Sequence, residues 1–88
     1  MTKQELLQEG CILSNTIHQK YEQILGTPQP DGYIFDDEQR YRNWLEAVQG
    51  FVYKNKIYPE QYDDFKWHKE HISPESHKSI LAIINSIE

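Results

Sequence analysis

The stretch that most constrains the fold is the segment from Asp36 to Asn55, which has the pattern of an amphipathic helix. Its apolar residues recur three or four positions apart, matching the helical period of about 3.6 residues; they are Tyr41, Trp44, Leu45, Val48, Phe51 and Val52. Asp36 is predicted to cap the first turn, with Gln39 reaching back. Gly50 indicates a close approach of a neighbouring helix, and the other segments are expected to pack on the apolar face.

A first helix is predicted from Thr2 to Leu25. Thr2 and Glu5 have the spacing of a capping box, and an apolar stripe follows, made of Leu6, Leu7, Cys11, Leu13, Ile17, Tyr21, Ile24 and Leu25. Gly10 lies on or beside this stripe and would let another helix come close. Gly26 fits the position after the helix end.

The segment Gly26 to Gly32 contains two prolines and two glycines. These residues forbid a continued helix and predict an exposed connection. Tyr33, Ile34 and Phe35 then predict a short extended piece that tucks against the entrance of the next helix.

Two more helices are expected in the last third of the chain. Tyr58, Tyr62 and Phe65 recur at helical spacing behind Pro59, which predicts a short helix of about Pro59 to Lys69. Ser73, Pro74 and Glu75 give a cap, a first-turn proline and an acid in the order that begins another helix.

These signals predict an all-α fold, a single helical domain over residues 1–88 with about four helices. Helices 1, 2 and 4 would supply most of the core, and helix 3 would be a short cover. The apolar pattern still runs at Glu88, so the last helix docks fully, meets a partner, or ends the N-terminal module of a longer protein.

The composition argues against several kinds of partner, bond and location. Nine basic against fourteen acidic residues give a net charge of −5, and the basic residues are scattered, which disfavours nucleic acid as a partner. A single cysteine excludes an internal disulfide. No stretch has the apolar length of a signal peptide or a membrane span, so we expect no membrane association and a cytoplasmic location.

Few residues have the spacing of a chemical site. His68, Glu70 and His71, with His77 downstream, could hold a metal ion, but the pattern is not an established zinc motif. Cys11 is interpreted as a buried, inert thiol. The pairs Asp36-Asp37 and Asp63-Asp64 are interpreted as a helix start and a solvated face. We therefore expect no catalytic residues, no cofactor, no bound metal and no small-molecule substrate.

Aromatic residues are the better candidates for binding. Trp44 lies on the apolar stripe and is predicted to be core. Trp67 is flanked by Lys66 and His68, and together with Tyr58, Tyr62 and the Ile83 side of the last helix it is predicted to form partner-binding surface.

A resemblance supports this interpretation. Glu9-Gly10, Tyr41, Trp44, Phe65, Ile72-Ser73-Pro74, His77 and the segment Leu81 to Ile87 stand in an order that resembles a helical N-terminal module of uncharacterised bacterial proteins associated with phage defence or mobile elements. The resemblance implies no catalytic residues, and it implies that the module ordinarily precedes an effector or sensor domain.

The function predicted is a non-catalytic one, either binding of a protein partner or self-association. Two alternatives stay open. A metal-binding enzyme or sensor would use His68, His71 and His77, whereas an acidic inhibitor would occupy the nucleic-acid groove of a basic protein.

Overall fold

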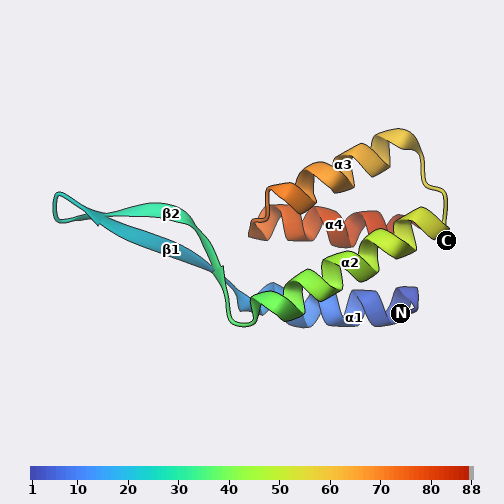
Figure 1. The fold of residues 1–88 in the computed structure, drawn as a ribbon, viewed down its shortest axis with the longest axis horizontal. Helices are drawn as coiled ribbons and strands as arrows, with labels where there is room; N and C mark the ends of the chain where they lie inside the picture. Colours follow the sequence, from blue (N-terminus) through green and yellow to red (C-terminus); the bar gives the residue numbers. More distant parts are fainter. Residues whose placement is uncertain (88) are drawn as a thin grey trace.

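The computed structural model describes residues 1–87, which form four helices and one β-hairpin (Figure 1). The order along the chain is α1 (Lys3–Leu13), a 3-10 turn η1 (Ser14–Thr16), β1 (Ile17–Ile24), β2 (Thr27–Phe35), α2 (Glu38–Lys54), α3 (Pro59–Glu70) and α4 (Pro74–Ser86). The helices pack as a bundle, and the hairpin projects from one end of it. The fold is therefore α+β, and the all-α prediction is wrong.

The first helix is much shorter than predicted, because two hydroxyl side chains bond to the carbonyls at its C-terminus. The Ser14 hydroxyl donates to the Cys11 carbonyl and the Thr16 hydroxyl donates to the Leu13 carbonyl, at 2.6 and 2.7 Å. These side chains satisfy carbonyls that have no partner within the helix. The N-terminus is as predicted, since Thr2 and Glu5 form a capping box.

A two-stranded antiparallel hairpin replaces the predicted end of the first helix and the predicted loop. Ile24 pairs with Thr27 across a two-residue turn in which Leu25 and Gly26 both have positive φ, 53° and 78°, as the tight hairpin turn needs. Between Gln19 and Tyr21 the register shifts, because β2 has Asp31 and Gly32 opposite a single residue of β1. Such a bulge increases the local twist.

The other helices lie close to their predicted bounds. The cap of α2 is Asp37, whose carboxylate accepts from the Arg40 amide at 3.0 Å; the predicted cap, Asp36, lies one residue earlier. Ser73 caps α4 through the Ser76 amide. As predicted, α3 is mainly a cover, with Phe65 as its one buried residue.

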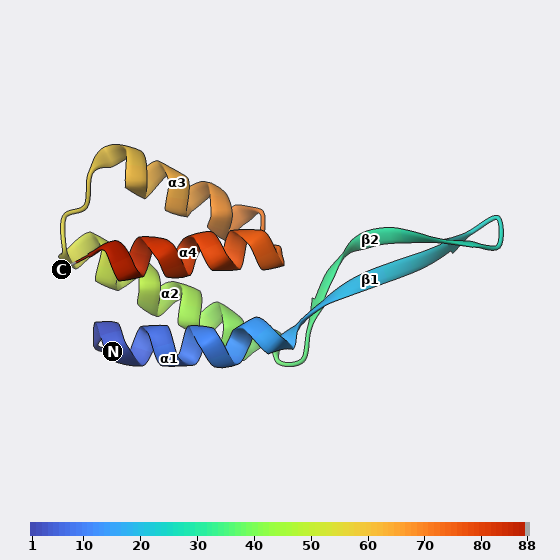
Figure 2. The same cartoon turned by 180° about the vertical axis from the view of Figure 1, so that it is seen from behind.

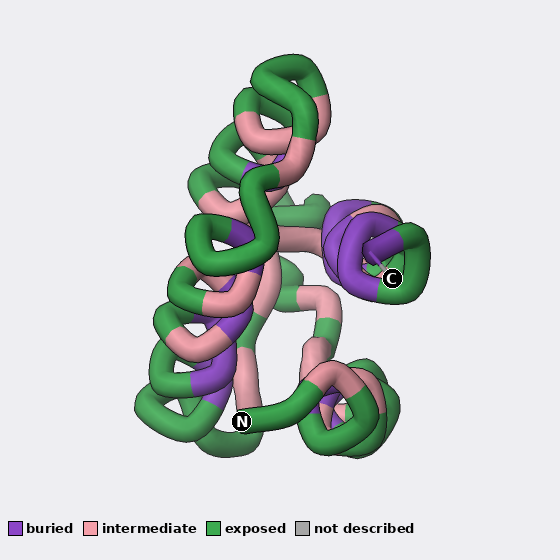
Figure 3. The backbone as a smooth tube through the Cα atoms, turned by 90° about the vertical axis from the view of Figure 1, so that its right-hand side faces the viewer, coloured by how far each residue is buried: buried purple, intermediate pink, exposed green. Residues whose placement is uncertain are grey.

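The core lies between α1, α2 and α4. Its buried hydrophobic residues are Leu6, Leu13, Tyr41, Trp44, Leu45, Val48, Val52, Phe65, Ile80, Ile83, Ile84 and Ile87. Figure 3 shows the buried positions concentrated along α2 and α4. Trp44 is at the centre, as predicted, and its indole Nε1 donates to the Leu6 carbonyl at 2.9 Å.

The two glycines singled out in the sequence have different surroundings. A Cβ added at Gly10 would lie 2.8 Å from Trp44 Cζ2 and would also collide with Leu81. The missing side chain at Gly10 therefore permits the close approach of neighbouring helices that was predicted there. Gly50 is exposed and a Cβ there would meet nothing within 4 Å, so the close approach predicted at Gly50 is wrong.

The hairpin gives the molecule an elongated shape, with principal extents of 49 × 24 × 17 Å. The radius of gyration is 14.5 Å, whereas a compact chain of this length would have about 12 Å. The described chain begins and ends at the end of the bundle opposite the hairpin (Figures 1 and 2). The hairpin is thus free of both termini.

Candidate functional site

The feature that most needs a functional explanation is the outer part of the hairpin, which we call the arm and define as residues 20–32. Every residue in this range is exposed, and Figure 2 shows that no helix covers either strand there. A hairpin of two strands is marginally stable in water unless a third strand or a helix supports it. The bundle gives the arm no such support.

The tip of the arm carries an apolar residue in a strained conformation. The Leu25 side chain is 100% exposed and its φ of 53° lies in the left-handed region, which costs roughly 1–2 kcal/mol for a residue with a Cβ. Ile24 and Tyr21, next along β1, are also more than half exposed. Exposed apolar residues grouped on one element, together with local strain, are typical of binding surfaces.

The base of the hairpin is anchored to the bundle, which fixes the direction of the arm. Ile17 and Phe35 pair across the strands and pack against the core, and the Phe35 ring lies 4.8 Å from that of Tyr41. His18 Nε2 lies 2.9 Å from the Asp36 carboxylate, and the Asp36 amide donates to the Thr16 carbonyl at 3.1 Å. The arm is therefore held on a rigid support.

The most buried polar groups of the described chain form a chain of hydrogen bonds between three helices. His77 is 1% exposed; its Nε2 lies 2.7 Å from the Gly10 carbonyl, and its Nδ1 lies 2.6 Å from the Tyr41 hydroxyl. A carbonyl only accepts, so Nε2 carries the proton and Nδ1 accepts from Tyr41. Burial lowers the pKa of His77 and raises that of Tyr41. Both groups stay neutral and have all their partners, which makes this a structural network.

The histidines considered for a metal site are not brought together. His77 belongs to the buried network, His68 Nδ1 lies 3.0 Å from the Ser76 hydroxyl, and His71 Nδ1 lies 2.8 Å from the Trp67 carbonyl. Among residues 1–87, no group of three or more His, Cys, Asp or Glu side chains is placed to hold a metal ion.

The predicted partner-binding residues are dispersed. Tyr58 and Trp67 are exposed, at 75% and 54%, but Trp67 is turned by about 140° from Tyr62 on the helix, at roughly 100° per residue. Tyr62 packs against Tyr53 and Phe65. Ile83 is buried in the core at 9% exposure, so little of its side chain is left for a partner. The Trp67 ring is stacked on His71, with centroids 4.3 Å apart.

Cys11 differs from its predicted place. It is exposed, because Leu6, Gly10 and Leu13 are the residues of α1 that face the core, and successive residues of a helix point about 100° apart. The prediction of a buried thiol at this position is wrong. Of the two acid pairs, Asp37 is a helix cap, and Asp63 and Asp64 are exposed on α3, as interpreted from the sequence.

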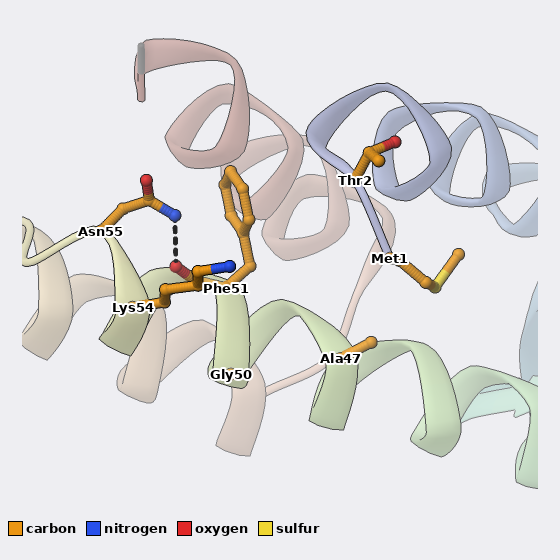
Figure 4. Close-up of a pocket in the computed structure, with 7 residues that line it drawn as sticks. All are labelled: Met1, Thr2, Ala47, Gly50, Phe51, Lys54 and Asn55. Carbon is orange, nitrogen blue, oxygen red and sulfur yellow. Dashed lines mark hydrogen bonds between the residues drawn. The ribbon is translucent and has the colours of Figure 1, made fainter.

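A shallow cavity of about 450 Å³ lies between the start of α1 and the second half of α2 (Figure 4). It is lined by Met1, Thr2, Ala47, Gly50, Phe51, Lys54 and Asn55. The Asn55 side-chain amide is already bonded to the Phe51 carbonyl at 2.8 Å, and Lys54 is the only charged side chain among the lining residues. This lining offers no pair of groups for acid–base or nucleophilic chemistry.

The arm was missed in the sequence because its apolar residues also fit a helical period. Ile17, Tyr21, Ile24 and Leu25 are spaced by four, three and one, a helical spacing that masks the extended pattern. Two signals could have revealed it. The β-branched and aromatic residues on both sides of Leu25-Gly26 favour strands, and the polar run Ser14-Asn15-Thr16 favours a helix end.

Within residues 1–87 no helix is both long enough and apolar enough to cross a membrane. Comparison of the chain with models of protein families, with curated proteins and with solved structures finds no match in any of the three.

Proposed function

We propose that the protein is a non-catalytic interaction module in which the helical bundle presents the arm to a protein partner. The observation that carries the proposal is the tip, where Leu25 is fully exposed and in a left-handed conformation. Burying a leucine side chain against a partner contributes about 1.5–3 kcal/mol. The strain of about 1–2 kcal/mol at the same residue is already present in the single chain, so it does not reduce this gain.

The predicted surfaces on α3 become secondary in this proposal. Trp67 is turned by about 140° from Tyr62 on α3, and Tyr58 precedes the helix as its N-cap. The arm, in contrast, places Tyr21, Ile24 and Leu25 on one projecting element. Association with phage-defence or mobile-element proteins stays a prediction from the resemblance alone.

Site-specific photocross-linking tests the proposal. A photoreactive phenylalanine derivative is introduced at Leu25, and in a matched control at Glu46, an exposed position on α2. After illumination of cells of the producing organism, we expect a cross-linked protein adduct from position 25 and much less from position 46. Absence of an adduct at position 25, or equal adducts at both positions, would contradict the proposal.

A further inference from the structure

The two outer edges of the hairpin differ in their ability to accept another strand. In an antiparallel pair, alternate residues point their backbone N–H and C=O groups away from the partner strand. Pro28 and Pro30 on β2 pair with Gln23 and Tyr21 on β1. A proline has no N–H, so it fits only positions whose amide would face outward. The outer edge of β2 therefore lacks two donors.

The outer edge of β1 keeps its donors. Because Tyr21 and Gln23 pair with the prolines, their own N–H and C=O groups face outward, and by alternation so do those of Gln19. The extra residue of the bulge lies on β2, which leaves β1 regular across this stretch. β1 thus offers an unbroken edge on the exposed arm, where a further strand can add by backbone hydrogen bonds.

The charges on β1 match a second copy of the same strand. If two β1 strands pair antiparallel with Tyr21 opposite Tyr21, Lys20 of each copy faces Glu22 of the other, which gives two ion pairs. This register also brings the outward groups of Gln19 opposite those of Gln23. A slip of two residues is the smallest that keeps the outward backbone groups of the two strands opposite one another. In one direction it puts Lys20 against Lys20, and in the other it puts Glu22 against Glu22; like charges directly opposite are destabilising.

The apolar residues fit the same arrangement. With Tyr21 at the centre, Leu25 of one copy reaches the level of Ile17 of the other, at the base of the hairpin.

Lys20 lies 3.9 Å from Asp31 of its own chain, with both side chains about half exposed, so it remains open to a second carboxylate.

We infer that two copies of this chain associate through their β1 edges, antiparallel and centred on Tyr21, to give a four-stranded sheet. The inference rests on the proposed function of the arm and names its partner as a second copy. The four strands give each hairpin the neighbour that it lacks in the single chain.

Charge reversal tests the pairing on the intact chain. Lys20→Glu alone and Glu22→Lys alone each replace two ion pairs by two repulsive pairs, and sedimentation velocity should show self-association weakened by about 10-fold or more. An equimolar mixture of the two variants has all charges complementary, so it should associate at least as well as the unchanged chain. The double variant with Lys20→Glu and Glu22→Lys should also recover self-association, because the glutamate at position 20 then faces the lysine at position 22 of the other copy in place of the original pair. Weakening without recovery in the mixture, or no weakening, would overturn the inference.

A disulfide tests the register. In a background of Cys11→Ser, Tyr21→Cys places two thiols at a pair whose Cα atoms lie about 5.5 Å apart, within disulfide range. Gln23→Cys is the control, since its two copies would lie roughly 14 Å apart along the strands, at about 3.4 Å per residue. We expect rapid covalent dimer from the first variant and little from the second. Equal rates, or no dimer from Tyr21→Cys, would overturn the register.

The outcome also separates this inference from the proposed function. If the purified chain is monomeric at every concentration and the photocross-linker at Leu25 captures a different protein, self-pairing is overturned while the arm remains the contact element. If position 25 gives no adduct at all, both fall.

Discussion

The substitutions Gly10→Ala and Gly50→Ala make the same chemical change inside two helices, and the structure predicts opposite effects on stability. Gly10 is buried, and its added Cβ would lie 2.8 Å from the Trp44 ring and collide with Leu81. Gly50 is exposed and has open space around the added methyl group. The pair therefore tests the packing at the centre of the bundle against a matched control.

The magnitudes follow from two terms. Alanine is favoured over glycine inside a helix by roughly 1 kcal/mol, and at Gly50 this term acts alone. At Gly10 the methyl group must displace Leu81 and the Trp44 ring, which is held by its hydrogen bond to the Leu6 carbonyl, and such overpacking costs about 1–3 kcal/mol. The net loss at Gly10 is about 1 kcal/mol, so the two variants should differ by about 2 kcal/mol.

Thermal and urea unfolding followed by circular dichroism measure this difference. For a domain of this size 1 kcal/mol shifts the Tm by about 4–8 °C; Gly50→Ala should raise the Tm and Gly10→Ala should lower it. If Gly10→Ala is stabilised as much as Gly50→Ala, then Trp44 and Leu81 do not crowd Gly10 and the packing described for the core is refuted.

Two further predictions concern a buried proton acceptor and a strained turn. Burial lowers the pKa of His77 below its ordinary value of 6.5, so the unfolded chain binds a proton first as pH falls. The contribution of His77 to stability should be constant above about pH 7.5 and should fall as the pH drops through 6.5, by up to about 1.4 kcal/mol per pH unit. Urea unfolding at a series of pH values should show a shallower fall in His77→Gln. Leu25→Asn places at the tip a residue that adopts positive φ more readily, so amide hydrogen exchange in the arm should slow, whereas Leu25→Ala, which keeps the strain, should leave it unchanged or faster.

The helices after the hairpin could be predicted from the sequence because their signals are local and agree with one another. The apolar period of α2, the proline at the first position of α3 and the Ser73 cap of α4 each fix one element without reference to the rest of the fold. The close approach at Gly10 was also predicted from its place beside an apolar stripe, but the same interpretation failed at Gly50, which is exposed and has open space around it.

The hairpin could not be predicted in the same way, because the apolar pattern of a strand shows only when one of its faces is buried. The residues of the arm face water on both sides, so no alternation marks it. Cys11 was wrongly placed on the buried face because it follows Leu7 by four residues, whereas the buried residues of α1 are Leu6, Gly10 and Leu13.

The binding residues were predicted on aromatic or aliphatic character, which does not distinguish a core residue from a surface one. Ile83 packs inside the bundle and Tyr62 lies against other rings. Exposure depends on where a whole element lies, and the projecting element was the one that the sequence pattern concealed.

The low local stability of the arm and its anchored base together explain how the bundle could present it for binding. The arm has its ladder of backbone hydrogen bonds and one strained turn, and it buries almost no apolar surface, so its local free energy of opening should be well below that of the bundle. The His18–Asp36 contact and the packing of Ile17 and Phe35 hold its base in place, which lowers the entropy lost when a partner binds. A second β1 strand would then supply the contacts that the arm lacks, so that association and ordering of the arm occur together. Amide exchange in residues 20–32 should therefore slow as the protein concentration rises, while exchange in α2 should not change.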